Sequence, residues 1–334
     1  MNNSSNESDQ EDLADEKTAN VQASHQQENT TPSETLPTLT DATIKRVKEG
    51  VAAAGDRAVR NTIEEILNRL EAINQGHPEP RINATVRRCA LRSLIHALFR
   101  VRVEHLERIP PKPAILAVNH LHHIDPFLLL AEIPTQPHYY FLGDARTLYN
   151  KWWKRFILRL AGGVVPLERI WKEEVAVIAA AKAGQQELVE LAAEIEKTVP
   201  TGGDIQTLRK IDRIILGILT HGDGIVLFPE GRLGATEGKL HLPLKRGTVM
   251  YALRAGVPIV PIALVGTHDL YLGKELAIRV GEPLYFSPTT RPKRQEVDAA
   301  LETLQNAILT LLPIDYQEPK EIKLFRSFLN HILW

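Results

Sequence analysis

The sequence lacks several features that would place it in well-known classes of protein. Its 334 residues include one cysteine, Cys89, so the disulfide framework of a small secreted protein is excluded. Cys89 lies among arginines and apolar residues, and we expect a buried or neutral thiol there and not a catalytic nucleophile. The N-terminus shows no basic start followed by an apolar stretch, and no later run reaches the roughly 18 to 20 apolar residues of a spanning helix. The sequence thus predicts neither a signal peptide nor a membrane span.

Positive charge is almost absent from the first 42 residues, which hold nine acids and one base. This segment carries −8, and because the whole chain carries −1, the remaining residues carry +7. Residues 1–40 are also rich in Asn, Ser, Gln and Thr, and their few apolar side chains cannot offset the entropy of ordering. We therefore predict a disordered acidic tail over 1–40. The basic remainder favours anionic partners, and without a Walker loop or a nucleic-acid-binding motif we expect no nucleic acid among them.

Short apolar runs alternate with helical patterns through the middle of the chain. The runs that we expect to be strands are 114–118, 138–143, 162–167, 224–229, 257–266 and 277–284. The helical stretches between them are about 126–133, 148–160, 172–198, 205–220 and 245–255. This alternation predicts a single α/β domain with a largely parallel mixed sheet flanked by helices. We place the α/β core at 109–290, with N-terminal helices over 41–108 and C-terminal helices over 291–334.

Three histidines and an aspartate are crowded into "NHLHHID", residues 119–125. The segment directly follows an expected strand, so His120 lies at a carboxyl strand end, where parallel sheets gather functional residues. One interpretation of Asp125 is structural, because Asp is a favoured N-cap and Pro126 is a favoured first helical residue. The other interpretation pairs Asp125 with His120, so that Asp125 holds the imidazole while its other nitrogen removes a proton from a hydroxyl. From these residues alone, both stay open.

A metal site is the third interpretation of this segment, with His120, His122 and His123 as ligands. The metal-binding hydrolase pattern His-x-His-x-Asp-His would need an acid at position 124, where this chain has Ile. We therefore disfavour a metal and expect no cofactor. His122 and His123 are expected to be solvated loop residues.

Three further segments follow in order: "GGVVPLER" (162–169), "VLFPEGRLG" (226–234) and "AGVPIVPIAL" (255–264). Each has an ordinary interpretation by itself, such as a solvated arginine at a strand end or a glycine turn after a strand. Together with "NHLHHID", they resemble the four sequence blocks of the glycerolipid acyltransferase family, which includes the 1-acylglycerol-3-phosphate acyltransferases. The resemblance covers roughly residues 110–285 and keeps the family order.

This resemblance implies a fold, an activity and a mechanism. The family transfers a fatty acyl group from a thioester to a hydroxyl in phospholipid synthesis or remodelling. His120 would act as general base on that hydroxyl, and Asp125 would orient and stabilise the imidazole. The alkoxide would then attack the thioester without an acyl-enzyme intermediate. The donor, acyl-CoA or an acyl carrier protein, would be a co-substrate and not a resident cofactor.

The resemblance also implies a binding site for a phosphate-bearing acceptor, built from Asn119, Arg169, Glu230, Gly231 and Arg232. The two arginines would bind the phosphate, for which the guanidinium fork is well suited. Glu230 and the turn at Gly231 would keep the shape of the pocket. The commoner third block reads Phe-Pro-Glu-Gly-Thr-Arg, whereas Arg232 follows Gly231 directly here, as in a subset of the family. The acceptor is expected to be a glycerol phosphate or a lysophospholipid.

Two stripes of aromatic and basic residues point to a lipid surface. They are "KWWKRFILRL" (151–160) and "KEIKLFRSFLNHILW" (320–334). Aromatic and basic residues together are typical of interfacial helices, although apolar stripes at helical spacing are usually core. We expect a peripheral protein on the cytoplasmic face of a membrane. The rival interpretations are a non-catalytic phospholipid-binding protein on the same fold and a metal-dependent hydrolase.

Overall fold

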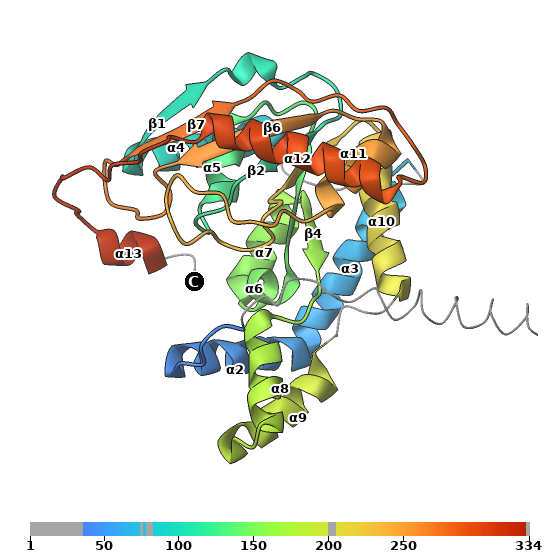
Figure 1. Cartoon of the computed structure of the whole chain (residues 1–334), viewed down its shortest axis with the longest axis vertical. Helices are drawn as coiled ribbons and strands as arrows, with labels where there is room; N and C mark the ends of the chain where they lie inside the picture. Colours follow the sequence, from blue (N-terminus) through green and yellow to red (C-terminus); the bar gives the residue numbers. More distant parts are fainter. Residues whose placement is uncertain (1–35, 74–75, 78–82, 200–204, 332–334) are drawn as a thin grey trace, which may run out of the picture. The chain divides into compact units, whose positions relative to one another are not determined.

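The described residues of the computed structural model, whose helices and strands are labelled in Figure 1, divide into two compact units. The description covers residues 36–73, 76–77, 83–199 and 205–331. The smaller unit holds 36–47 and 171–193, and the larger unit holds the described residues of 48–170 and 194–331. The predicted acidic tail, 1–40, lies outside the described residues apart from its last five, which have no regular structure.

A seven-stranded sheet forms the centre of the larger unit. Its strands are β1 (Arg100–Glu104), β2 (Ile115–Val118), β3 (Tyr139–Asp144), β4 (Val164–Leu167), β5 (Gly224–Leu227), β6 (Ile259–Val265) and β7 (Glu275–Val280). They lie in the order β1-β7-β6-β2-β5-β3-β4, and every neighbouring pair is parallel except β6 with β7. This confirms the predicted α/β class with a largely parallel mixed sheet.

The edge strand β1 lies inside the region 41–108, which was predicted to be helical, so that prediction is wrong for this stretch. β1 pairs in parallel with β7, and Val101 and Val103 align with Leu276 and Ile278. Its sequence, "RVRVE", alternates basic and apolar residues as a half-buried strand should. This alternation follows the helix that ends at Leu98 almost directly, and no glycine or proline marks the boundary between them.

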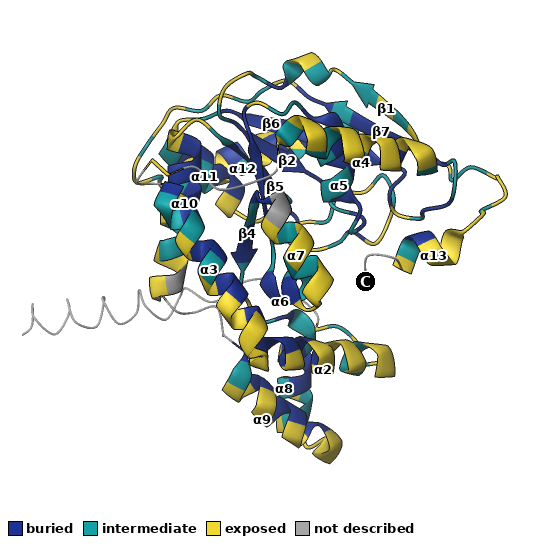
Figure 2. Ribbon diagram, turned by 180° about the vertical axis from the view of Figure 1, so that it is seen from behind, coloured by how far each residue is buried: buried dark blue, intermediate teal, exposed yellow. Residues whose placement is uncertain are grey.

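Helices pack on both faces of the sheet, one core on each face, and the central strands are coloured as buried in Figure 2. The helices of the larger unit are α3 (Arg57–Ile73), α4 (Ala84–Leu98), α5 (Asp125–Glu132), α6 (Ala145–Tyr149), α7 (Trp152–Ala161), α10 (Ile205–Thr220), α11 (Gly247–Ala255), α12 (Arg294–Leu311) and α13 (Arg326–His331), with a 3-10 turn η1 at Leu106–Arg108. On one face, Ile115 and Ala117 of β2 join a core with α3, α10, α11 and α12. On the other, Leu116 and Val118 join a core with α4 and α5. Because both faces are covered, β2 is apolar at every position.

The smaller unit is helical. It holds the start of α2 (Asp41–Gly55), all of α8 (Lys172–Lys182), the 3-10 turn η2 (Gln186–Leu188) and the start of α9 (Val189–Thr198). Glu174 is fully buried, and its Oε2 accepts a hydrogen bond of 2.7 Å from the backbone N–H of Trp171 at the start of α8. The single helical stretch predicted over 172–198 is divided, because Gly184 follows α8 in the left-handed region with φ of 101°.

The stripe on α7 is exposed. Trp152, Phe156 and Ile157 are 74%, 61% and 50% exposed, so these side chains do not belong to the core (Figure 2). In the C-terminal stripe, four apolar side chains are exposed, namely Ile322, Leu324, Phe325 and Phe328. Leu329 is buried against the core, and Ile332 lies outside the described residues. Among the described residues, no helix has the length and apolar content needed to cross a bilayer.

Cys89 is exposed on α4, so of the two expectations for this thiol, buried or neutral, burial is wrong. Among the residues of α4, Ile95 is the fully buried one, and the helix turns that side toward the sheet. Six residues of an α-helix amount to about 600° of rotation, which places Cys89 well away from the side that carries Ile95.

Candidate active site

The four sequence blocks meet at one edge of the sheet. His120 follows β2, Arg169 follows β4, Glu230 follows β5, and the fourth block runs through β6. These strands point the same way, and the carboxyl ends of parallel strands lie at a common edge. Three of the strands, β6, β2 and β5, are direct neighbours. The loops after them therefore form one surface.

His120 and Asp125 form the pair that the sequence allowed. Their Nδ1 and Oδ2 atoms are 2.9 Å apart, and the His120 ring stacks on Phe228 with 4.1 Å between ring centroids. Asp125 is completely buried, whereas the His120 side chain is 17% exposed. Because the carboxylate can only accept, Nδ1 carries the proton and Nε2 keeps its lone pair. Among the described residues, none bonds Nε2, so this atom is the one that can accept a proton from a bound hydroxyl.

The interpretation of Asp125 as an N-cap does not hold. The N-cap position of α5 is Ile124, and no side chain caps this helix. Instead, Oδ2 of Asp125 turns back onto the preceding loop and accepts from the backbone N–H groups of Leu121 and His122 at 2.8 and 2.9 Å. One carboxylate oxygen thus accepts three donors, and it fixes both the His120 ring and the loop that carries it.

Asn119 and Glu230 brace this loop from within the fold. Asn119 is fully buried, and its amide both donates to and accepts from the backbone of Leu264 on β6, at 3.0 and 2.6 Å. The two oxygens of buried Glu230 accept from the backbone N–H groups of His120 and His241, at 2.8 and 2.7 Å. Burial raises the pKa of Glu230, and these two backbone hydrogen bonds oppose the rise. Both side chains are occupied by backbone groups, so they position the loop of His120.

Basic side chains surround the turn at Gly231, which has φ of 67°. Arg169 donates from Nη1 to the Gly231 carbonyl at 3.0 Å, and Nη2 of Arg232 lies 3.1 Å from Nδ1 of His241. The Lys245 stem packs so closely that a Cβ on residue 231 would sit 3.1 Å from its Cγ. We call Arg169, Arg232, His241 and Lys245 the basic rim. Both arginines are exposed, and the missing threonine of the third block does not turn Arg232 away from this turn.

His122 is buried, so the expectation of a solvated loop residue is wrong for it. Its Nδ1 accepts from the backbone N–H of Ile124 at 3.2 Å, which ties the ring into the turn before α5. Burial lowers the pKa of His122, opposed by the Asp125 carboxylate and the Asn330 backbone. His123 is half-buried, and its ring meets the His122 ring edge-on. Within the described part of the chain, no three His, Cys, Asp or Glu side chains are placed to hold one metal ion.

Four residues of the site were not singled out from the sequence, and one of them is Lys245, which packs against Gly231. Phe228 supplies the ring that supports His120, and His241 contacts both Glu230 and Arg232. Arg146, almost fully buried on α6, donates to the backbone carbonyl of Arg169 at 2.8 Å. Phe228 belongs to the "FPEG" block, which was a usable signal. Arg146 and His241 come from segments without a motif, and only the folded chain brings them here.

Comparisons with known proteins match the part of the chain that carries these residues. A family model described as Acyltransferase matches residues 100–265, from the first residue of β1 to the last of β6. A 1-acyl-sn-glycerol-3-phosphate acyltransferase of Cocos nucifera is 29% identical over 130 residues, or 37% of this chain and 40% of that protein. The 1-acyl-sn-glycerol-3-phosphate acyltransferase alpha of Ovis aries is 30% identical over 118 residues, or 33% of this chain and 38% of that protein.

The crystal structure of the 1-acyl-sn-glycerophosphate (LPA) acyltransferase PlsC from Thermotoga maritima aligns with a TM-score of 0.42 and 17% identity, covering 83% of this chain and 89% of that one. The chain spans about two fifths of the length of the coconut and sheep proteins. The matched range contains all four blocks and six of the seven strands. The fold and the site together define an acyltransferase domain. The chain belongs to the glycerolipid acyltransferase family.

Proposed function

We propose that this protein transfers a fatty acyl group from an acyl thioester to a hydroxyl of a glycerol phosphate or lysophospholipid. The observation that carries the proposal is the buried Asp125 carboxylate, whose Oδ2 lies 2.9 Å from Nδ1 of His120 and leaves Nε2 with a lone pair. A histidine held in this way is suited to act as a general base. The relatives named above supply the substrate class, since both are 1-acyl-sn-glycerol-3-phosphate acyltransferases.

In this mechanism, Nε2 of His120 takes the proton of the acceptor hydroxyl as its oxygen attacks the thioester carbonyl carbon. The C–O bond forms, and the carbonyl becomes a tetrahedral oxyanion. Its collapse breaks the C–S bond, and the departing thiolate takes the proton back from Nε2. The transient imidazolium is stabilised by the adjacent Asp125 carboxylate, because a charge-assisted hydrogen bond is stronger than a neutral one. No covalent bond to the enzyme forms.

The basic rim is the proposed site for the acceptor phosphate. Arg169 and Arg232 are exposed beside the turn that Glu230 ties to the backbone of His120, so a phosphate bound there lies in reach of the dyad's loop. Guanidinium groups bind phosphate through paired N–H donors. Lys245 adds a further cation next to the same turn.

A lipid surface is the proposed partner of α7 and the C-terminal segment. Trp152, Phe156 and Ile157 on α7 are exposed next to several basic residues, and Phe325 and Phe328 are exposed near Lys323 and Arg326. This composition binds interfaces reversibly, and anionic lipids add to the attraction. We propose peripheral association with the cytoplasmic face of a membrane, where both acceptor and product are held.

The test of the function is an acyl-transfer assay with the purified full-length chain. Acyl-CoA and acyl carrier protein are each offered with glycerol 3-phosphate and a panel of lysophospholipids, and both the new ester and the released thiol are measured. Equal amounts of ester and thiol are expected with at least one pair. Thiol without ester would identify a thioester hydrolase, and binding of lysophospholipid with no turnover would favour a non-catalytic phospholipid-binding protein.

A further inference from the structure

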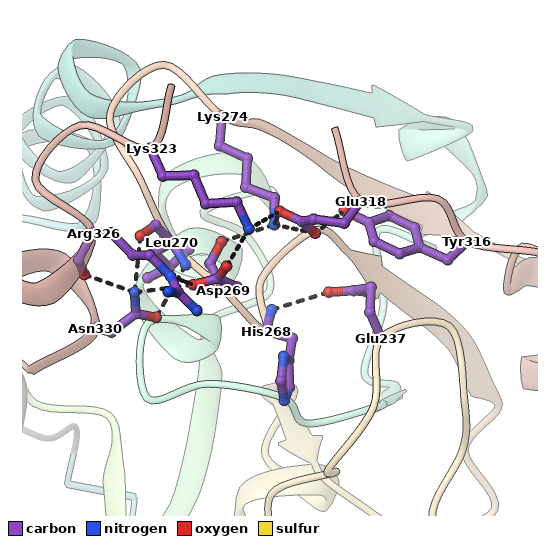
Figure 3. Close-up of polar contacts among 10 residues, drawn as sticks. All are labelled: Glu237, His268, Asp269, Leu270, Lys274, Tyr316, Glu318, Lys323, Arg326 and Asn330. Carbon is purple, nitrogen blue, oxygen red and sulfur yellow. Dashed lines mark hydrogen bonds and ion pairs between the residues drawn. The ribbon is translucent and has the colours of Figure 1, made fainter. Parts of the chain in front are cut away.

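A cavity of about 860 Å³ opens beside the proposed active site, and the mechanism above does not use it. Three segments line it: residues 235–237 after the third block, residues 268–269 after β6, and the C-terminal segment between 316 and 331 (Figure 3). The volume lies within the range of small-molecule sites, about 300 to 1,000 Å³. The C-terminal wall lies beyond the range matched by the family model.

The cavity adjoins the loop of the catalytic pair. The backbone N–H of Gly234 donates to the carbonyl of His120 at 2.6 Å, and the first lining residue, Ala235, is next in the chain.

Two of the three acids that line the cavity are neutralised within the protein (Figure 3). Asp269 pairs with Arg326 at 2.7 Å and with Lys323 at 2.6 Å. Glu318 pairs with Lys323 and with the fully buried Lys274, at 3.2 and 3.0 Å. These pairs fasten the C-terminal segment to the loop after β6 and complete the wall.

Glu237 is the third acid, and no cation among the described residues pairs with it. Its Oε2 accepts from the backbone N–H of His268 at 3.0 Å, as Figure 3 shows. Its Oε1 is buried without a hydrogen-bond partner in the described part of the chain. Burial raises the pKa of Glu237, and the backbone of His268 and Gly266 and the charge of Lys274 oppose the rise. Buried polar groups nearly always have partners, so this oxygen at the cavity wall indicates a polar occupant.

We infer that this cavity is a second substrate subsite, which binds the head group of the lysophospholipid substrate. The head group donates a hydrogen bond from an ammonium or a hydroxyl, and the Glu237 carboxylate accepts it. The inference rests on the proposed function and deepens it. The basic rim, on the third-block turn at Gly231, binds the phosphate, and the head group beyond the phosphate extends along residues 234–237 into the cavity.

The experiment compares acceptors that share one acyl chain and differ in head group. Lysophosphatidic acid has none, lysophosphatidylglycerol offers hydroxyls, lysophosphatidylethanolamine offers an ammonium with N–H donors, and lysophosphatidylcholine offers a cation of similar size without N–H donors. The kcat/KM for each is measured with the wild type, Glu237→Gln and Glu237→Ala. Glu302→Gln, an exposed acid on α12, is the matched control.

The wild type is expected to have a higher kcat/KM for lysophosphatidylglycerol or lysophosphatidylethanolamine than for lysophosphatidylcholine. If the subsite binds an ammonium, Glu237→Gln should lower the kcat/KM for lysophosphatidylethanolamine, relative to that for lysophosphatidic acid, about 10- to 100-fold, the factor expected for a hydrogen bond to a charged group. If the subsite binds a hydroxyl, Glu237→Gln should keep most of the preference for lysophosphatidylglycerol over lysophosphatidic acid, and Glu237→Ala should lose it. The control should leave every ratio unchanged. Glu237 variants that slow all four acceptors equally, or that raise only the KM of the acyl donor, overturn the inference.

Binding separates this inference from the proposed function. Calorimetric titration of each lysophospholipid into the protein without donor reports the head-group preference even if no acyl transfer occurs. A Glu237-dependent preference without turnover would retain the subsite and contradict the enzyme. Turnover without such a preference would retain the enzyme and contradict the subsite. Melting temperatures of the Glu237 variants exclude unfolding, since Gln keeps an oxygen for the His268 amide.

Discussion

Replacement of Asp125 by asparagine tests the role of this carboxylate most sharply. The Oδ2 atom accepts from Nδ1 of His120 and from two backbone N–H groups. The asparagine oxygen can still accept from the two amides, so the loop should keep its shape. The negative charge is lost, however, and a neutral amide oxygen stabilises the imidazolium less than a carboxylate does. The amide NH₂ takes the position of Oδ1, which has no hydrogen-bond partner among the described residues.

The loss of the charge is therefore the main effect of Asp125→Asn. A charge-assisted hydrogen bond to the imidazolium is worth about 1.5 to 3 kcal/mol, or roughly 10- to 100-fold in rate. We expect kcat/KM to fall by about this factor. Unfolding free energy should fall by no more than about 2 kcal/mol, because both backbone donors keep a partner. Asp125→Ala differs, since two orphaned amides cost about 2 to 6 kcal/mol together.

The assay is acyl transfer at limiting acceptor, paired with urea unfolding of each variant. Asp315→Asn, on an exposed acid of the C-terminal segment, is the control and should change neither quantity. If the kcat/KM of Asp125→Asn were within a few-fold of the wild-type value and its stability were unchanged, the charge of Asp125 would have no role in catalysis, and the residue would only hold the loop in place.

Three further predictions concern the rim, the membrane surface and His122. Arg169→Ala and Arg232→Ala should each raise the KM for a phosphate-bearing acceptor about 10- to 100-fold, and the double variant should lose less than the product, because the two contacts share one phosphate; equal defects for acceptors without phosphate would contradict this. A Trp152→Ala, Phe156→Ala double variant should bind vesicles of phosphatidylglycerol and phosphatidylcholine more weakly, and wild-type binding should weaken with salt; binding unchanged by both would place the contact elsewhere. Because the pKa of His122 is lowered in the folded protein, its neutral form stabilises the fold above about pH 6.5, and this contribution is lost as pH falls toward the folded pKa. The unfolding free energy of His122→Asn, whose side chain does not titrate, should therefore depend less on pH across this range than that of the wild type; an equal dependence would contradict this.

The fold was largely predictable because the strands are apolar throughout. A run such as β2 reads as a strand buried on both faces, and six of the seven strands were found in this way. β1 was missed because its half-buried alternation follows a helix directly. Whether the apolar side chains of α7 are buried or exposed could not be predicted from their spacing, because an apolar stripe has the same period whether it faces the core or the solvent.

In the site, order and spacing predicted the residues that meet, but not what each one touches. The spacing of His120 and Asp125 indicated the pair, yet whether the carboxylate caps α5 or turns back onto the loop depends on the backbone around Leu121. Glu230 could be read as a substrate ligand until both oxygens were seen on backbone amides. Arg146 needed the structure altogether, because its partner is a backbone carbonyl remote in sequence.

The most direct measurement of the central claim is the rate of ester formation by His120→Ala, compared with the wild type and with His77→Ala, an exposed histidine remote in sequence from the site. All three are assayed with the donor and acceptor that the wild type uses best, and folding is verified by circular dichroism and unfolding. The account predicts that His120→Ala is folded and loses about 10²- to 10⁴-fold or more of kcat/KM, while His77→Ala keeps the wild-type rate. A folded His120→Ala that forms ester at the wild-type rate would contradict it.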